Sequence, residues 1–240
     1  MFRLNFFIMR NTLIFSLILS TSVILNSQNL DAGAYSNEGL FVFGITKTKP
    51  QANLEIKGSQ YFDKEFKLAF LKYYNKKMDK QGYMRYNGFT DEIEISSTPN
   101  AKFSETVLLR DKYLTPIISN ETFIYLPHRL KDNRAVIGYL IQKYSSKKYK
   151  IYEKRKKVFN EGVRARTSLE NSFPPRYIDK IDLYISIQDN TPFIVPPRRK
   201  DFINLFKNSD LIKKYIKENN LKINAVNDII KIVKFAEAIR

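Results

Sequence analysis

The hydrophobic pattern of this chain changes its period once, and this change constrains the fold more than any other feature. Before the pair Pro196-Pro197, short apolar segments alternate with polar residues, as in half-buried strands. From Arg199 onward, apolar residues recur at the spacing of one helix face. Strands followed by helices favour an α+β fold over an alternating α/β fold. We therefore expect an antiparallel β-sheet or roll followed by a C-terminal cap of two to three helices.

The clearest predicted strand is Asp179 to Gln188, in which isoleucine and leucine alternate with polar side chains. A turn at Asp189-Asn190 and the apolar run Phe193 to Val195 complete a hairpin. By contrast, we expect Asn75 to Gly82 to form a hairpin loop. The same patterns predict further short strands at 40–43, 66–74, 83–87, 92–96, 107–110, 122–126, 135–144 and 147–159.

Three helices are expected after the period changes. The first spans Asp201 to Phe206, and Ser209 is a plausible N-cap for the second, Asp210 to Glu218. Asn224 is the expected N-cap of the last helix. Its apolar stripe is Val226, Ile229, Ile230 and Val233.

The first 27 residues have the layout of a secretory signal peptide. Arg3 and Arg10 precede an apolar block from Leu13 to Leu25, and a short polar tail ends near Gln28. The block has 13 residues, fewer than the ~20 that a membrane-spanning helix requires, although an uncleaved anchor is the alternative. We therefore expect export to the periplasm, the cell surface or the medium, with no transmembrane span in the mature chain.

The domain organisation follows from these boundaries. We expect a signal peptide at 1–27, a flexible mature N-terminus at 28–53, a β-rich body at 54–197 and a helical cap at 198–240 packed on the same body. Cysteine is absent, so disulfides, thiolate metal sites, thiol catalysis and lipidation at an N-terminal cysteine are excluded. Stability must therefore come from burial of the core.

The chain is strongly basic, with 41 Lys and Arg residues against 24 Asp and Glu residues and a net charge of +17. Such a charge attracts anionic partners such as lipid headgroups, lipopolysaccharide or acidic glycans, and another envelope protein is a further possible partner. Export disfavours nucleic acid as the anion. The alternative is a compositional bias without functional meaning.

The most unusual segment is a basic ribbon from Lys147 to Phe159, where lysine and arginine are interleaved with tyrosine. A row of this kind can follow a polyanion. The alternative is an exposed edge strand that lysines protect from pairing with other edges. The candidate anion-binding residues are Lys148, Lys150, Lys154, Arg155, Lys156, Lys157 and, beyond a turn, Arg164 and Arg166.

Catalytic chemistry finds little support in the sequence. Asp91, Glu92 and Glu94 cluster, and paired carboxylates can hydrolyse glycosides, but a solvated sheet surface is the simpler interpretation. The single histidine, His128, follows a proline and is expected in a loop. We assign no catalytic, cofactor-binding or metal-binding residues. The favoured role is a non-enzymatic envelope protein, with a glycan-active hydrolase or an assembly scaffold docking through the C-terminal apolar stripe as alternatives.

Five short segments of the chain form a familiar pattern: Lys57-Gly58-Ser59-Gln60-Tyr61, Met84-Arg85-Tyr86-Asn87, Asp91-Glu92-Ile93-Glu94, the hairpin from Tyr184 to Val195, and Lys200-Asp201-Phe202-Ile203-Asn204-Leu205-Phe206. Together they resemble a family of uncharacterised exported envelope proteins of the Bacteroidota. This resemblance implies a β-rich body with a helical C-terminus and an envelope location, and it implies no catalytic residues.

The leader yields a direct test. We expect the exported protein to begin near Gln28, because Ser27 is the small residue that best fits the position before a cleavage site. Mass spectrometry or Edman degradation of the protein purified from its producing cells identifies the N-terminus. A purified protein that still begins at Met1 would contradict the prediction.

Overall fold

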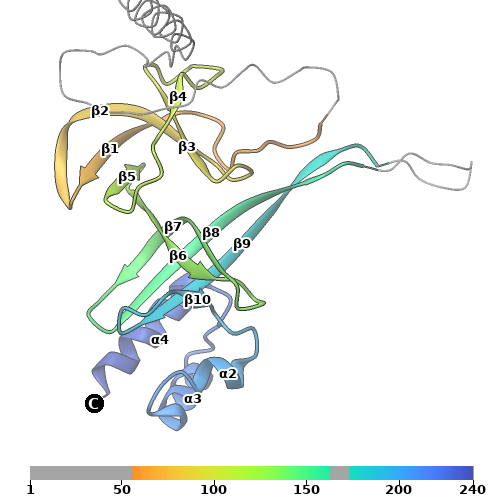
Figure 1. Ribbon diagram of the computed structural model, residues 1–240. Helices are drawn as coiled ribbons and strands as arrows, with labels where there is room; N and C mark the ends of the chain where they lie inside the picture. The colour runs from red at the N-terminus through yellow and green to blue at the C-terminus, as the bar shows by residue number, and fades with distance from the viewer. Residues whose placement is uncertain (1–55, 163–172, 240) are drawn as a thin grey trace, which may run out of the picture. The chain divides into compact units, whose positions relative to one another are not determined.

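The computed structural model describes residues 56–162 and 173–239 (Figure 1). Within these ranges, ten strands form one sheet and three helices follow it, which confirms the α+β fold with a C-terminal helical cap. The predicted leader, the flexible segment 28–53 with its strand at 40–43, Arg164 and Arg166 lie outside the described residues. No helix in the described ranges is both long enough and apolar enough to cross a bilayer.

The elements follow one another in the order strands, then helices. The strands are β1 (Lys67–Tyr73), β2 (Lys76–Asn87), β3 (Glu92–Ser96), β4 (Thr106–Val107), β5 (Leu114–Ile118), β6 (Glu121–Arg129), β7 (Ala135–Ser145), β8 (Tyr149–Asn160), β9 (Arg176–Ile187) and β10 (Phe193–Ile194). The helices are α2 (Arg199–Ile203), α3 (Ser209–Glu218) and α4 (Val226–Ala238).

Five strands close into a ring. β6, β7, β8 and β9 pair in sequence order, and β10 pairs with both β9 and β6. Phe193 of β10 is opposite Ile185 on β9 and opposite Arg129 on β6. The Arg129 amide also donates a hydrogen bond to the Pro192 carbonyl at 2.8 Å. Each strand of the ring contributes to one small apolar cluster, which consists of Ile124, Leu126, Leu140, Tyr152, Tyr184 and Ile194.

The other five strands continue the sheet from β5 in the order β5, β1, β2, β3, β4. Their largest apolar cluster is shared with the ring, because Phe123 on β6 and Tyr139 and Ile141 on β7 belong to it. The remaining buried members come mainly from β1, β2, β3 and β5. One core therefore spans the junction between β1–β5 and the ring.

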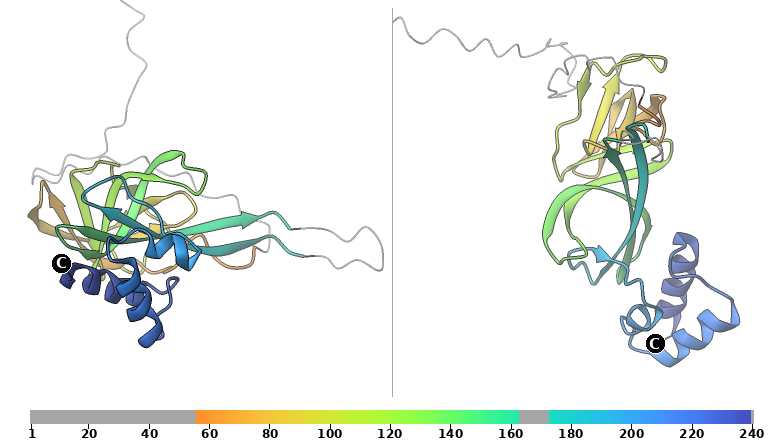
Figure 2. Two further views of the ribbon diagram at one scale, coloured as in Figure 1. Left: turned by 90° about the horizontal axis from the view of Figure 1, so that it is seen from below. Right: turned by 90° about the vertical axis from the view of Figure 1, so that its right-hand side faces the viewer.

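The three helices lie together at one end of the sheet (Figure 1, Figure 2). Tyr149 and Ile151 of β8 and Ile185 of β9 form a common core with the buried faces of the helices. The helical side chains in this core include Phe202, Phe206, Ile212, Ile216, Ile229, Ile232 and Val233. The amphipathic period read from the sequence after Arg199 is therefore used to cover β8 and β9.

Most predicted strands are found, but the first hairpin was placed wrongly. The turn lies at Tyr74 and Asn75, which have φ values of 48° and 63°, and β2 begins at Lys76. The residues predicted as a loop are a strand because asparagine tolerates positive φ and closes the turn earlier. Lys76 and Lys77 are exposed beyond the core, so this arm of the hairpin lacks the apolar alternation that signals a strand.

Smaller differences concern β5 and the helix caps. β5, which contains Pro116, was not predicted from the sequence. Its pairing with β6 begins only at Ile117, so the proline lies where β5 is an edge. β4 has two residues instead of the predicted four. The N-cap residues of α3 and α4 are Asn208 and Ala225, not Ser209 and Asn224, and neither makes a side-chain capping hydrogen bond.

Helix α2 offers a test of the helical cap. We expect Phe202→Ala to lower the free energy of unfolding by about 3–5 kcal/mol, because the Phe202 side chain is fully buried between the helices and the sheet. Urea denaturation measures this loss. The control is Leu211→Ala, at a leucine on α3 that is 49% exposed and should change stability by less than ~1 kcal/mol. Equal losses in the two variants would contradict the assigned packing.

Candidate anion-binding site

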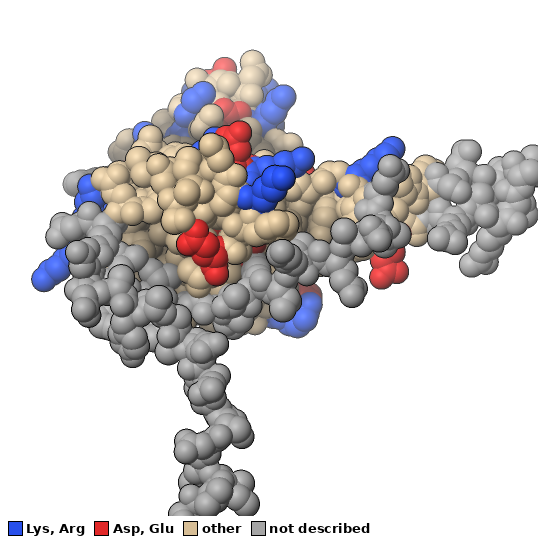
Figure 3. Space-filling view, turned by 90° about the horizontal axis from the view of Figure 1, so that it is seen from above, with Lys and Arg blue, Asp and Glu red and all other residues tan. Residues whose placement is uncertain are grey.

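The basic residues of β8 are mostly neutralised within the fold. Among the six candidates that the structure describes, five have a carboxylate oxygen within 3.8 Å. On the face shown in Figure 3, Lys and Arg occur in separate groups with Asp and Glu between them. The ribbon is therefore not a continuous row of unpaired cations. The pairs are Lys150–Asp189, Lys154–Asp91, Arg155–Glu121, Lys156–Asp182 and Lys157–Asp179.

Lys154 lies deepest, with 4% of its side chain exposed. Its ammonium is 2.6 Å from Asp91 Oδ1 and donates a hydrogen bond to the Tyr139 carbonyl at 2.9 Å. The Tyr86 hydroxyl donates to the same carboxylate oxygen at 2.7 Å. Burial lowers the pKa of Lys154, and the Asp91 charge opposes this effect. The pair joins the turn between β2 and β3 to β8, so its role is structural.

Gly138 on β7 makes room for this ion pair. A Cβ atom at this position would lie 2.3 Å from Asp91 Oδ2 and 3.1 Å from the Lys154 ammonium. Any larger side chain would therefore displace the carboxylate. The backbone of β7 is part of the wall that surrounds the buried charges.

The carboxylates proposed for a hydrolase do not converge. Glu94 is 1% exposed and accepts two hydrogen bonds from the Arg85 guanidinium, at 2.8 and 2.9 Å. Asp91 is held by Lys154, and Glu92 lies 3.5 Å from Arg110. The interpretation of Glu94 as part of a solvated surface was wrong, because Glu94 belongs to a buried ion pair.

The surroundings of Glu94 are closed by aromatic rings. The Arg85 guanidinium carbon lies 3.9 Å from the centre of the Tyr61 ring and 4.1 Å from that of Phe66. The Tyr61 hydroxyl contacts both Glu94 oxygens, at 2.9 and 3.1 Å. Burial, followed by the Glu94 charge, raises the pKa of Tyr61 to about 12. This tyrosine therefore stays protonated and donates to Glu94.

His128 is on a strand, contrary to the predicted loop. It belongs to β6 and is 1% exposed, and the edge of its ring meets the Tyr184 ring at a centroid distance of 5.1 Å. Burial lowers its pKa. These contacts are those of a core histidine.

One small cavity lies over paired charges. It has a volume of about 90 Å³ and is lined in part by Arg85, Arg155 and Glu121. Arg155 forms hydrogen bonds with both Glu121 oxygens, at 2.6 and 2.7 Å, and Lys143 also contacts Glu121. The charges around this cavity are therefore already satisfied.

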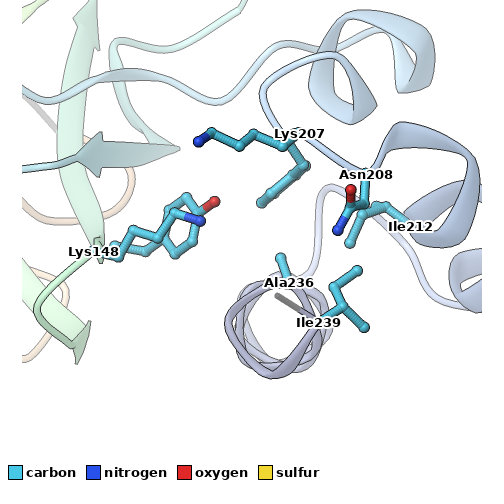
Figure 4. Close-up of a pocket in the computed structure, with 8 residues that line it drawn as sticks. Lys148, Lys207, Asn208, Ile212, Ala236 and Ile239 are labelled. Atoms are coloured by element: carbon cyan, nitrogen blue, oxygen red, sulfur yellow. The ribbon is translucent and has the colours of Figure 1, made fainter.

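A larger pocket separates the turn between β7 and β8 from the helical cap (Figure 4). It has a volume of about 200 Å³. Lys148 reaches the pocket from the β7–β8 turn and Lys207 from the segment before α3. Ala236 lies on α4 and Ile239 at its end (Figure 4). The complete lining is Lys148, Tyr149, Phe206, Lys207, Asn208, Ile212, Ala236 and Ile239.

The turn that presents Lys148 is held by Ser146. The Ser146 hydroxyl oxygen accepts hydrogen bonds from the amides of Lys148 and Tyr149, at 3.3 and 3.0 Å. It also donates to the Glu237 carboxylate of α4, whose other oxygen accepts a bond from the Tyr144 hydroxyl at 2.7 Å. These contacts attach the turn to α4 and fix the backbone from which Lys148 projects.

Two lysines at this pocket remain unneutralised. Across the described ranges, neither Lys148 nor Lys207 has a carboxylate oxygen within 4 Å, which separates Lys148 from the other candidates on β8. Asn208, the N-cap of α3, makes no capping hydrogen bond and lines the same pocket. The site therefore combines two cations and an amide with an apolar floor.

Only part of this site was predicted from the sequence. Lys148 was among the predicted residues, whereas Lys207 and Asn208 were missed. Nothing in the local pattern distinguishes Lys207 from the other lysines of the helical region. The packing of α3 and α4 against β8 brings them together.

Comparisons of the chain with protein-family models, with curated proteins and with solved structures found no match. The resemblance to exported proteins of the Bacteroidota stays a prediction.

Gly138 supplies the test of the buried ion pair. We expect Gly138→Ala to lower the free energy of unfolding by about 1–3 kcal/mol, because the new methyl group overlaps Asp91. The matched control is Gly82→Ala on β2, where no atom lies within 4 Å of the added Cβ. Thermal unfolding of both variants is the measurement. A stability loss at Gly82 equal to that at Gly138 would contradict the steric argument.

Proposed function

We propose that this protein is exported and binds a small amphiphilic anion in the pocket between the β7–β8 turn and the helical cap. The leader supports export, because its charged start, short apolar block and polar tail suit a signal peptide. The pocket supports binding, because it places two unneutralised lysines beside an apolar floor. The proposal retains the anion-binding role expected from the sequence and moves it from the ribbon to one end of β8.

The chemistry of the lining suggests how such a ligand lies. A carboxylate or phosphate group binds the ammonium groups of Lys148 and Lys207, because a hydrogen bond between two charged groups is stronger than one between neutral groups. The hydrocarbon part lies on the apolar side chains of the pocket. These side chains are Phe206, Ile212, Ala236 and Ile239.

The size of the pocket restricts the ligand. Its volume of about 200 Å³ is below the range of ~300–1,000 Å³ that is common for sites binding drug-sized molecules. A short-chain or medium-chain carboxylate fits this restriction, as does the anionic end group of a larger envelope component. The part of the ligand that binds is therefore an anionic group with a short hydrocarbon segment.

One observation carries the proposal. Within the described ranges, the fold pairs five basic residues of β8 with carboxylates and leaves Lys148 opposite Lys207 without one. Two neighbouring cations without a counter-charge favour an anion between them. The hydrolase alternative lacks an equivalent feature, because Asp91 and Glu94 are held in separate ion pairs.

Octanoate is a suitable probe of the pocket. We expect Lys148→Met and Lys207→Met each to weaken octanoate binding about tenfold, equivalent to ~1.4 kcal/mol, because each variant removes one ammonium from the carboxylate. Isothermal titration calorimetry measures the affinity. Octanamide, which has the same chain without the charge, should bind more weakly to the unmodified protein.

Lys147→Met and Lys213→Met are the matched controls. Lys147 is next to Lys148 in the same turn and Lys213 is on α3, but neither lines the pocket. Both controls should bind octanoate as the unmodified protein does. Equal weakening in controls and pocket variants would show attraction by net charge alone and would refute the site.

A further inference from the structure

A group of exposed tyrosines and lysines lies at the opposite end of β2 from the β2–β3 turn. It is formed by the β1–β2 turn and by the segment that leads into β5. We call this group the tyrosine–lysine tip. Its members are Tyr73, Tyr74, Tyr113, Lys72, Lys76, Lys77 and Lys112.

The tip is held together by backbone and ring contacts. The Tyr74 amide donates a hydrogen bond to the Tyr113 carbonyl at 3.1 Å. The rings of Tyr74 and Tyr113 are stacked, with centroids 4.2 Å apart, and Tyr73 meets Tyr74 edge to face at 4.6 Å. The three rings therefore form one unit that spans two segments of the chain.

All three rings of the tip are exposed. Tyr73 is 46% exposed, Tyr74 is 55% exposed and Tyr113 is 38% exposed. Tyrosine combines an apolar ring with a polar hydroxyl and is favoured where an apolar phase meets water. A cluster of three exposed tyrosines at the end of a hairpin indicates a contact surface.

The tip is positively charged. Among the side chains that the structure describes, none of the carboxylate oxygens lies within 4 Å of the four lysines of the tip. The carboxylate of the nearby Asp111 accepts a hydrogen bond from the Tyr113 amide at 2.8 Å and stabilises the turn. The surface therefore suits an anionic partner.

The covered faces of Tyr113 favour a bilayer surface over a partner that stacks on aromatic rings. One face of Tyr113 is covered by Tyr74, and the ammonium of Lys112 lies 4.7 Å from the centre of the Tyr113 ring. Sugars and nucleic-acid bases bind aromatic side chains by stacking on an open face. Binding to the interfacial layer of a bilayer does not require an open ring face. The edges and hydroxyls of the tyrosine rings can lie among the headgroups, while the lysine side chains reach the lipid phosphates.

We propose that the tyrosine–lysine tip docks the protein on the surface of an anionic lipid bilayer. The tyrosine rings enter the headgroup layer, and Lys72, Lys76, Lys77 and Lys112 contact lipid phosphates. This surface is separate from the pocket beside Lys148 and does not depend on the pocket being occupied.

The chain contains no tryptophan, so a single substitution creates a specific optical probe. Tyr74→Trp should show a blue shift of its emission with vesicles of phosphatidylcholine and about one third phosphatidylglycerol, since the ring leaves water. The control is Phe89→Trp, at an equally exposed aromatic residue in the β2–β3 turn, and its emission should not change. A shift in both variants, or in neither, would overturn the proposal.

Vesicle co-sedimentation tests the lysines. The double variant Lys76→Ser/Lys77→Ser should weaken binding of the full chain about thirtyfold, whereas Lys213→Ser/Lys217→Ser, which removes the same charge from α3, should weaken it less than about threefold. Binding to pure phosphatidylcholine vesicles should be far weaker. Binding should also fall at high salt, because ions screen surface charges.

Three outcomes would overturn the proposal. Equal effects of the two double variants would indicate attraction by overall charge. Equal binding to neutral and anionic vesicles would exclude a role for the lysines. Binding to dextran sulfate that depends on Tyr74, without binding to vesicles, would identify an acidic polysaccharide as the partner. Octanoate binding is measured without vesicles, so failure here leaves the proposed pocket function standing.

Discussion

The ion pair between the buried Lys154 and the half-buried Asp91 is the polar contact on which the junction within the sheet depends. It attaches the β2–β3 turn to β8, and two further contacts reinforce it: the Tyr86 hydroxyl, which donates to Asp91, also lies 3.0 Å from the Arg155 carbonyl oxygen, and the Lys157 amide donates to the Gly88 carbonyl. Breaking one partner of such a pair leaves an unpaired charge in a region of low dielectric, which is far more costly than losing a surface ion pair. The junction lies beside the apolar core shared by β2, β6 and β7, to which Tyr86 and Tyr139 belong.

This junction explains why β8 is both basic and well packed. The strand has neighbours of three kinds along its length. Tyr149 and Ile151 pack against the helices, Tyr152 belongs to the cluster of the ring, and Lys154 reaches the β2–β3 turn. The following basic residues meet carboxylates on β6 and β9, so most of the charge of β8 is used within the fold. Lys148, in the turn just before the strand, and Tyr149 at its start line the larger pocket.

The pocket and the tyrosine–lysine tip share one physical property, although they lie on different elements. In each, lysines that have no carboxylate partner among the described side chains are placed beside apolar or aromatic surface. Other basic residues, such as Arg85 with Glu94, are paired with carboxylates inside the fold. Positive charge therefore indicates an anion-binding surface only where the lysines and arginines are not already paired with carboxylates of the same chain. The proposed ligands, an amphiphilic carboxylate and an anionic bilayer, follow from these two environments.

Periodicity alone determined the class of fold, because alternation and helical spacing are local consequences of backbone geometry. It located β3 and β9, and it placed the amphipathic helices after Arg199. It failed for β2 near Lys76, where the strand extends beyond the core and no alternation is needed. The burial of Glu94 and Lys154 and the meeting of Lys148 with Lys207 were decided by the tertiary structure. The physical reason is that charge pairing depends on distances between segments far apart in the chain, about which local sequence patterns carry no information.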